Sequence, residues 1–254
     1  MNHRLRTFFR IGWLKSLYIN FCLLPFKQAI HMPIVALRNT QLESLSGKMV
    51  LNCPASFGIV KLGFLHTDLM SWKEDNMYLN INGTVVINGW IQFGVGSKLI
   101  VDKGATLSFG EDSCIGSNTR IVCREKITIG AHFRAAWDVQ IMDTNFHYIK
   151  DVITGRINRR TEPIVLGNNN WIGNRSSVMQ GTRTNDYFIL ASNSMANKNY
   201  TQTISSYSLM AGNPAKLLKG NVCRVLDYRE EREITELFKG TDESFIFVDV
   251  NPKK

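Results

Sequence analysis

The sequence has few of the residues that mark a disulfide-bonded or zinc-binding protein. It holds five cysteines in 254 residues, scattered along the chain and without a CxxC pair or a Cys/His ligand spacing. A disulfide framework and a structural zinc site are therefore not expected. We interpret the cysteines as reduced, small apolar fillers of a cytoplasmic protein. With 44% hydrophobic and 20% charged residues, the composition also argues against a generally disordered chain.

Acidic residues are missing from the start of the chain, where none precedes Glu43. The same segment contributes six basic residues, which are Arg4, Arg6, Arg10, Lys15, Lys27 and Arg38. Its apolar residues recur every three or four positions, which predicts a helix; they are Leu5, Phe8, Phe9, Trp13, Leu17, Phe21 and Leu24. The segment forms the first expected domain, residues 1–45.

A long apolar run is also missing from this segment. Lys15 and Asn20 interrupt it before it reaches the ~20 residues that a membrane span needs, and no small-residue cleavage site follows. A basic, aromatic helix of this kind can lie on an anionic membrane surface, here through residues 1–30. It can equally pack on its own domain or on a neighbouring subunit. Nucleic acid is not expected as a partner, because the basic residues alternate with Leu and Phe and no nucleic-acid motif is present.

From about residue 79 a repeat of six residues replaces the ordinary helix and strand periods. Aliphatic or aromatic residues recur at Phe109, Ile115, Ile121, Ile127, Phe133 and Val139, and a second run follows at Leu166, Ile172, Val178, Thr184, Leu190 and Ala196. Small residues recur four places after several of these, at Thr119, Ala131, Ser176, Thr182 and Ser194. One inward apolar residue in every six predicts a parallel β-helix, in which three short strands form each coil. We expect this all-β domain over residues 46–220, with a C-terminal helical cap and tail over 221–254.

The two runs are out of phase, because Val139 and Leu166 are 27 residues apart and 27 is not a multiple of six. We therefore expect an excursion loop over about residues 144–163. A loop of this length in a compact domain is usually functional. His147, in "MDTNFH", lies at its root.

These residues resemble the left-handed β-helix hexapeptide-repeat acyltransferases, and among them the O-acetyltransferases of sugars and capsular polysaccharides. The resemblance covers about Leu79 to Lys219 and rests on the hexads, "MDTNFH", the restart "IVLGNNNWIG" and the terminal "AGNPAKLLKG". It implies a left-handed column, a homotrimer, and acetyl-coenzyme A bound between neighbouring columns. It also implies that the loop presents the catalytic histidine.

Among the five histidines, only His147 occupies the position that the resemblance assigns to the general base. The others are His3 and His31 in the basic segment, His66 before the repeats and His132 inside a hexad. Neutral imidazole suits the removal of a sugar hydroxyl proton as the oxygen attacks a thioester. Asp143 or Asp138 could orient the ring, with Asp143 preferred. Trp171 is expected either beside the thioester or at a subunit interface.

The resemblance places coenzyme A along the turns of the second run. The expected binding residues there are Gly173, Arg175, Ser176, Ala191 and Ser192, with Lys198 and Lys216 for its phosphates. The chain departs from the family at Asn174 and Arg175, which replace small residues, so Arg175 could itself contact a phosphate. Three loop arginines, Arg156, Arg159 and Arg160, are candidates for binding an acidic glycan or a lipid-linked diphosphate, the alternative being a solvated loop.

Three hypotheses follow from the sequence. The first is an acetyl-coenzyme A-dependent O-acetyltransferase that acts on a cell-surface polysaccharide or its precursor, by direct transfer, in the cytoplasm or at the inner membrane face. The second, a zinc enzyme on the same scaffold, needs three histidines, whereas only His132 and His147 lie among the repeats. The third is a non-catalytic trimeric scaffold or glycan-binding protein. Binding of the coenzyme separates the third from the first.

Overall fold

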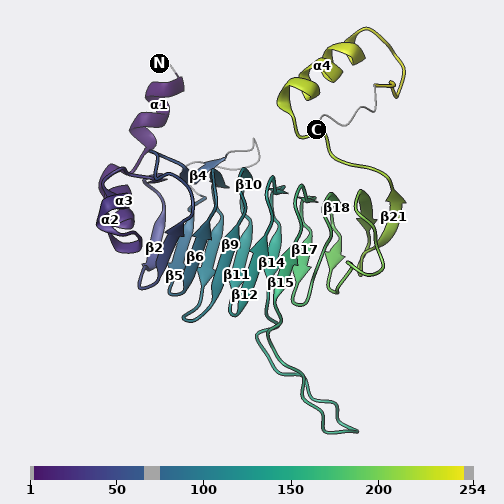
Figure 1. Ribbon diagram of the computed structural model, residues 1–254, viewed down its shortest axis with the longest axis horizontal. Helices are drawn as coiled ribbons and strands as arrows, with labels where there is room; N and C mark the ends of the chain where they lie inside the picture. The colour runs from purple at the N-terminus through teal and green to yellow at the C-terminus, as the bar shows by residue number, and fades with distance from the viewer. Residues whose placement is uncertain (1–2, 66–74, 249–254) are drawn as a thin grey trace.

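The computed structural model describes residues 3–65 and 75–248. These residues form a column of short strands with helices at its N-terminal end and a further helix after its last strand (Figure 1). The helices are α1 (His3–Arg10), α2 (Trp13–Leu23), α3 (Phe26–Ala29) and α4 (Tyr228–Lys239). Within the described ranges, none of these helices has the length and apolar content needed to cross a membrane. His66 and the ends of the chain, residues 1–2 and 249–254, lie outside the described residues.

The strands form three sheets, one on each side of the column. The nine-stranded sheet contains, in spatial order, β1 (Ile34–Ala36), β4 (Val60–Leu65), β7 (Ile91–Gly94), β10 (Ser113–Ile115), β13 (Arg134–Ala135), β16 (Trp171–Ile172), β18 (Phe188–Leu190), β20 (Ser208–Ala211) and β21 (Lys216–Gly220). The seven-stranded sheet contains β19 (Met195–Ala196), β17 (Ser177–Met179), β14 (Gln140–Met142), β11 (Arg120–Cys123), β8 (Lys98–Val101), β5 (Tyr78–Ile81) and β2 (Gln41–Ser44). The five-stranded sheet contains β15 (Ile164–Leu166), β12 (Lys126–Ile129), β9 (Thr106–Phe109), β6 (Thr84–Ile87) and β3 (Lys48–Leu51).

The pairing pattern is that of a parallel β-helix. Through most of the column each strand pairs with the strand three places later, so that the chain visits the three sheets in turn and then begins the next coil. In the seven-stranded sheet, for example, Ile121 pairs with Ile141 and Ile141 with Val178. The described strand pairs are parallel except for β20 with β21. The sequence prediction of a mostly β protein built from parallel strands is therefore confirmed.

The residues that the six-residue repeat marks all lie in the interior of the column. All twelve are at most 5% exposed: Phe109, Ile115, Ile121, Ile127, Phe133, Val139, Leu166, Ile172, Val178, Thr184, Leu190 and Ala196. Each coil therefore buries its apolar side chains against those of the coils before and after it, and stability depends on the stack. Thr184, the one polar residue in the series, accepts hydrogen bonds from the backbone N–H of Gly167 and from the side-chain amide of Asn170.

Small hydroxyl residues at the corners link each coil to the next. The hydroxyl of Thr119 donates to the carbonyl of Ala136, that of Ser176 to Ala191, and that of Thr182 to Ala196, over 2.8–3.2 Å. A side chain at such a corner must be short and must satisfy a backbone group that would otherwise be buried without a partner. This explains why small residues recur four places after the apolar position.

Three expectations differ from the structure. Strands β1 and β2 already belong to the column, so its start lies before residue 46. Helix α4 has no buried residue and does not cover the last coil; instead β21 turns back antiparallel on β20 and occupies the edge of the nine-stranded sheet. The cysteines are all free, but Cys22 and Cys223 are exposed and so are not core fillers, unlike buried Cys123.

Candidate active site

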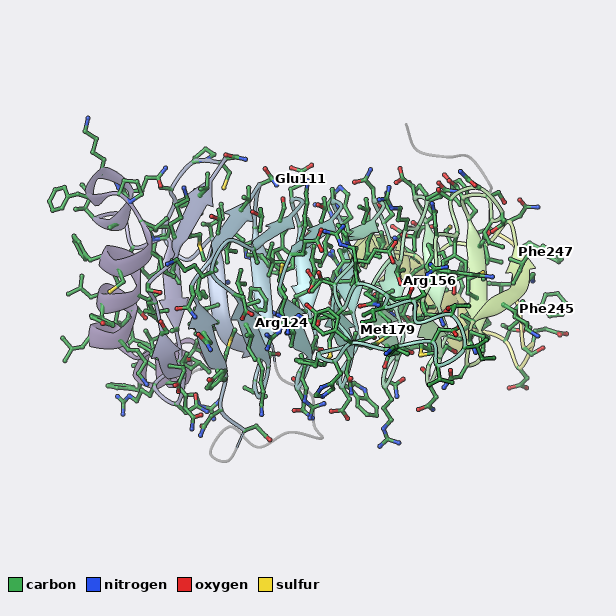
Figure 2. The ribbon with its side chains drawn as sticks, turned by 90° about the horizontal axis from the view of Figure 1, so that it is seen from below. Glu111, Arg124, Arg156, Met179, Phe245 and Phe247 are labelled. Atoms are coloured by element: carbon green, nitrogen blue, oxygen red, sulfur yellow. The ribbon has the colours of Figure 1, made fainter. Side chains whose placement is uncertain are left out.

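The excursion loop is a narrow two-stranded ribbon. The chain leaves the seven-stranded sheet after β14 and enters the five-stranded sheet at β15. Between them the two arms meet through antiparallel bridges from Thr144 to Thr161 and from Lys150 to Ile157. The ribbon extends far from the column, at the lower side in Figure 1 and toward the viewer in Figure 2. Its end is open to solvent, because Val152 and Ile153 are more than 90% exposed.

Asp143 anchors the root of this ribbon. Its side chain is fully buried, and its two carboxylate oxygens accept the backbone N–H groups of Arg124, Glu125 and Lys126, each over 2.8 Å. These three amides belong to the corner of the preceding coil, between β11 and β12. Charge-assisted hydrogen bonds of this kind are about twice as strong as neutral ones. The carboxylate therefore fixes the place from which the loop departs.

His147 follows directly on this anchored turn. Phe146 has a left-handed backbone conformation (φ 63°), and its N–H donates to the hydroxyl of Thr144 over 2.9 Å. The N–H of His147 donates to the carbonyl of Asn145, and the guanidinium of Arg124 lies 5.1 Å from the centre of the Phe146 ring. The backbone at His147 is thus held, while its side chain is exposed. Among the described residues, its ring makes no hydrogen bond, which leaves the imidazole available to a substrate.

The preferred orienting partner of His147 has another role in the structure. Asp143 directs both of its oxygens to backbone amides of the neighbouring coil, and no hydrogen bond to His147 occurs within the described part of the chain. Asp138 accepts a hydrogen bond from the side-chain amide of Asn118 at a different corner. The expectation that Asp143 orients the imidazole is therefore replaced by a structural role in the loop root.

Two buried oxygens near the loop root have no hydrogen-bond partner among the described residues. They are Oε2 of Glu125, in the coil before the loop, and Oε1 of Gln180, in the coil after it. Both residues occupy the corner between the seven-stranded and five-stranded sheets, from which the loop departs. The six-residue period did not predict these two residues, because it marks only the apolar positions and not the corners.

Trp171 begins β16 in the nine-stranded sheet, on a different side of the column from the loop. It pairs in register with Arg134 and Ile189, and its indole lies under the guanidinium of Arg224 at 4.9 Å from the ring centre. Arg224 belongs to the segment that leads from β21 to α4, which is at the upper side in Figure 1, whereas the loop is at the lower side. One chain therefore does not bring Trp171 and His147 together. The sequence could not predict the contact with Arg224, because that residue lies beyond the repeat.

Five of the expected coenzyme-binding residues lie at one corner, between the nine-stranded and seven-stranded sheets. They are Gly173, Arg175 and Ser176 in one coil and Ala191 and Ser192 in the next. Gly173 donates its N–H to the carbonyl of Leu190 over 2.7 Å, and a Cβ atom at this position would lie 2.6 Å from the Ser192 nitrogen. The two coils therefore approach more closely here than any larger residue permits.

Arg175 adopts a backbone conformation on this corner that long side chains rarely take, and Asn118, Asp138 and Asn193 adopt it at the equivalent corners of other coils. The φ of Arg175 is 57°, in the left-handed region, and its guanidinium lies 5.2 Å from the centre of the Trp137 ring in the coil before. The charged group therefore folds back along the column, over Trp137. The column therefore accommodates the large Arg175 side chain, where the family that the sequence resembles has small residues, because the guanidinium stacks on Trp137 of the neighbouring coil.

The two expected phosphate-binding lysines lie apart from each other. Lys216, in β21, pairs with Ala211, which continues the corner of Gly173 and Ala191 one coil further. Lys198 follows β19, the last strand of the seven-stranded sheet. It lies on the same edge of the column as the loop, two coils further along the chain. Its ammonium is 5.4 Å from the centre of the Tyr200 ring. Lys198 and Gly173 therefore do not share a corner within one chain.

All three arginines proposed for substrate recognition are exposed on the ribbon. Arg156 donates to the side-chain oxygen of Asn158 over 3.1 Å, and Arg160 lies 5.4 Å from the centre of the Tyr148 ring. Figure 2 labels Arg156 on the loop that points toward the viewer. No acidic side chain pairs with these guanidinium groups among the described residues, so their charges are directed to solvent.

His132 is not part of this arrangement. Its Nδ1 lies 3.0 Å from Oδ2 of Asp112, which also accepts a hydrogen bond from Arg134 over 2.7 Å. Asp112 and His132 are twenty residues apart and lie at equivalent corners of successive coils, which the coil length could have indicated. No group of three or more residues suited to hold a metal ion occurs within the described ranges.

Comparisons with known proteins place this chain beside acetyltransferases. It is 26% identical over 125 residues to the polysialic acid O-acetyltransferase of Escherichia coli O1:K1, covering 49% of this chain and 39% of that protein. It is 40% identical over 55 residues to a probable macrolide acetyltransferase of Lysinibacillus sphaericus, covering 22% of this chain and 28% of that protein. The chain thus matches well under two thirds of the length of either relative. No protein-family model matches it.

A solved structure with a similar arrangement is that of the polySia-specific acetyltransferase NeuO. It is 21% identical and covers 80% of this chain and 93% of its own, with a TM-score of 0.46. At this identity and score, the likeness says nothing about activity. The two curated proteins to which the sequence is related are both acetyltransferases, and one of them acts on a polysaccharide.

Proposed function

We propose that this protein is an O-acetyltransferase that moves the acetyl group of acetyl-coenzyme A to a sugar hydroxyl of a cell-surface polysaccharide or its precursor. One observation carries the proposal: His147 sits on a turn held by the buried carboxylate of Asp143, with its imidazole exposed at the base of a long ribbon. The sequence relationship to two acetyltransferases supports the same chemistry. The repeat column supports it as well, through the resemblance to the hexapeptide-repeat enzymes.

In the proposed reaction, His147 acts as a general base. The sugar hydroxyl oxygen attacks the thioester carbonyl while the imidazole takes the hydroxyl proton. The tetrahedral intermediate carries its negative charge on the former carbonyl oxygen, which a backbone N–H at a coil corner would stabilise. Collapse expels the coenzyme thiolate, which takes the proton from the imidazolium. The acetyl group passes directly to the sugar, and no acyl-enzyme forms.

We propose that the site is completed in a homotrimer of left-handed columns. Within one chain, His147 and Trp171 lie on different sides of the column, and Lys198 and Gly173 lie at different corners. A neighbouring copy would bring the loop corner of one column against the nine-stranded sheet of the next. Trp171 would then form an apolar wall beside the thioester that His147 approaches.

Acetyl-coenzyme A would lie along the corner that contains Gly173 and Ala191. The close stacking of the two coils exposes backbone amides and carbonyls to which an extended pantetheine arm can hydrogen-bond. Ser176, Ser192 and Arg175 lie on the same corner. Lys216 of the same chain and Lys198 of the neighbouring copy would contact the phosphates of the coenzyme. No metal takes part in this mechanism.

The acceptor in this proposal is an acidic glycan or a lipid-linked diphosphate. Arg156, Arg159 and Arg160 supply guanidinium groups, which match carboxylate and phosphate oxygens in geometry. The polysialic acid named for one relative is an acidic polymer, consistent with this class of acceptor. We place the reaction in the cytoplasm, at or near the inner face of the cell membrane.

The test measures release of free coenzyme A thiol from acetyl-coenzyme A in the presence of acidic and neutral glycans. His147→Ala should lower acceptor-stimulated release by roughly 10²- to 10⁴-fold, the usual contribution of a general base. His132→Ala is the matched control, because His132 pairs with Asp112 away from the loop. Full activity of His147→Ala would refute the role of this residue. Failure of the wild-type protein to bind the coenzyme would leave the non-catalytic scaffold as the better hypothesis.

The role of the loop arginines is tested separately. Replacing Arg156, Arg159 and Arg160 together with alanine should raise the KM for an acidic acceptor and leave the KM for acetyl-coenzyme A unchanged. Arg229→Ala, in exposed α4, controls for the loss of positive charge. Equal KM values for acidic and neutral acceptors in the wild-type protein would show that these arginines do not select the acceptor.

A further inference from the structure

We infer that the N-terminal helices form a docking surface for an anionic lipid bilayer. The surface consists of the exposed apolar side chains of α1, α2 and α3 together with Phe57. This inference does not depend on the proposed acetyltransferase activity, because it concerns the end of the column remote from β21 (Figure 1).

Helix α2 buries one face against the column and exposes the opposite face, which is apolar. One face is buried against the column and contains Ser16, Ile19, Asn20 and Leu23, at the helical spacing of three and four. The other face repeats that spacing with Leu14, Leu17, Tyr18 and Phe21, which are 84%, 44%, 59% and 45% exposed. A helix at a protein surface normally turns its apolar side chains to the core and its polar side chains to water. Packing on the protein accounts for only one of the two faces.

Specific hydrogen bonds prevent α2 from turning its second face inward. The side-chain amide of Asn20 donates to the carbonyl of Ile34 over 2.7 Å and accepts the N–H of the same residue over 3.0 Å. The hydroxyl of Ser16 accepts the N–H of Ala36 over 2.9 Å. Both side chains are fully buried and extend the edge of β1, so rotation of the helix would leave these polar groups without partners.

Two groups of aromatic rings accompany the exposed face. Trp13 lies 5.0 Å from Phe8 and 6.2 Å from Phe57, measured between ring centres, and Phe21 lies 5.8 Å from Phe26. All five rings are between 37% and 69% exposed. Exposed apolar side chains that gather on one surface mark interaction sites, and aromatic side chains are favoured at the boundary between lipid and water.

The charge around this surface indicates lipid as its occupant. No acidic residue precedes Glu43, while Lys27 and Arg38 are exposed beside the apolar face. The ammonium of Lys15 instead donates to the backbone carbonyls of Arg38 and Thr40, so Lys27 and Arg38, and not Lys15, are the exposed cations beside the apolar face. A second copy of this surface would bring like charges together, whereas anionic headgroups would neutralise them. None of the described helices is suited to span the bilayer, so the surface would lie in the interface.

The experiment is co-sedimentation of the full-length protein with vesicles, either of phosphatidylcholine alone or of phosphatidylcholine mixed with phosphatidylglycerol. We expect binding to the anionic vesicles that weakens as salt is added. Leu14→Glu with Tyr18→Glu should reduce binding by at least about tenfold, because both side chains would otherwise leave water. Lys27→Gln alone should reduce it about fivefold.

Leu218→Glu is the matched control, since this exposed leucine lies in β21 at the other end of the column. It should bind anionic vesicles like the wild-type protein. All variants should keep the wild-type circular dichroism and the wild-type release of coenzyme A thiol with a soluble acceptor. A loss of thiol release in every protein, including the wild type, would refute the proposed function and leave the lipid result intact.

Three results would overturn the inference. The first is an absence of wild-type binding to anionic vesicles at low salt. The second is equal binding of the wild-type protein and the Leu14→Glu, Tyr18→Glu variant. The third is a smaller particle mass in solution for that variant than for the wild-type protein, when the wild-type protein itself does not bind vesicles. This result would show that the surface joins two copies of the protein.

Discussion

The guanidinium of Arg224 lies over the indole of Trp171, 4.9 Å from its centre, although the two residues are 53 positions apart in the sequence. Arg134 neighbours Trp171 in the sheet and interacts electrostatically with Arg224. The segment that follows the column thus returns to cover the tryptophan of the proposed site. Arg224 would hold the indole in place, and it adds a second positive charge on this side of the column.

Removing this contact should impair transfer. Arg224→Ala should lower kcat/KM by roughly three- to thirtyfold, the range expected for one cation–π contact. Arg224→Lys should recover part of the loss, since the charge remains but the planar group does not. Steady-state kinetics with the best acceptor measure the effect, with Arg229→Ala as control. Wild-type kinetics for Arg224→Ala would show that the contact has no bearing on catalysis.

Replacing Asp143 should reduce stability before it affects chemistry. Asp143→Ala leaves three backbone N–H groups without an acceptor, so the free energy of unfolding should fall by about 3 kcal/mol or more. Asp143→Asn should also destabilise, because its NH₂ group would face N–H donors. Denaturant unfolding measures both, and Asp138→Asn, whose amide oxygen can still accept the hydrogen bond from Asn118, should cost less. If Asp143→Asn instead kept full stability and lost kcat, the aspartate would be orienting His147 after all.

Gly173→Ala should disturb the proposed coenzyme groove. A Cβ atom would lie 2.6 Å from the nitrogen of Ser192 and 2.8 Å from the carbonyl oxygen of Leu190, so the two coils would have to separate. We expect a loss of about 1–3 kcal/mol in the free energy of unfolding together with weaker binding of acetyl-coenzyme A. Gly220→Ala is the control, because nothing lies within 4 Å of its Cβ position. Unchanged coenzyme binding in a destabilised Gly173→Ala protein would place the groove elsewhere.

The Asp112 cluster should make stability fall in acid. Partial burial alone would raise the pKa of Asp112, but hydrogen bonds from His132 and Arg134 outweigh it and hold that pKa below its ordinary value. The stabilisation is therefore present above pH of about 4 and is lost as the pH falls through the lowered pKa. The free energy of unfolding of Asp112→Asn should depend less on pH in this range than that of the wild-type protein. Parallel curves for the two proteins would rule out this contribution.

The sequence by itself determined the column. The six-residue period placed the marked residues from Phe109 to Ala196 on the buried side of the coils, because successive coils stack in register. It did not mark the second buried residue of many strands, such as Ile129 or Ile141. The period also located the excursion loop, since Val139 and Leu166 are out of phase. Positions such as Ser176 and Thr182 were recognisable because a close corner tolerates only a short side chain.

The tertiary structure decided which residues meet. Asp143 was assigned to His147 on proximity in the chain, yet its carboxylate turns to Lys126 and its neighbours because the coil stacked below supplies three free amides. Arg224 reached Trp171 through the path of β21, which no period encodes. The exposed face of α2 likewise became visible only when Asn20 and Ser16 were seen fixed to β1. The six-residue repeat determines the contacts between successive coils. The contacts that Arg224 and α2 make with the column depend instead on how segments outside the repeat fold back on it.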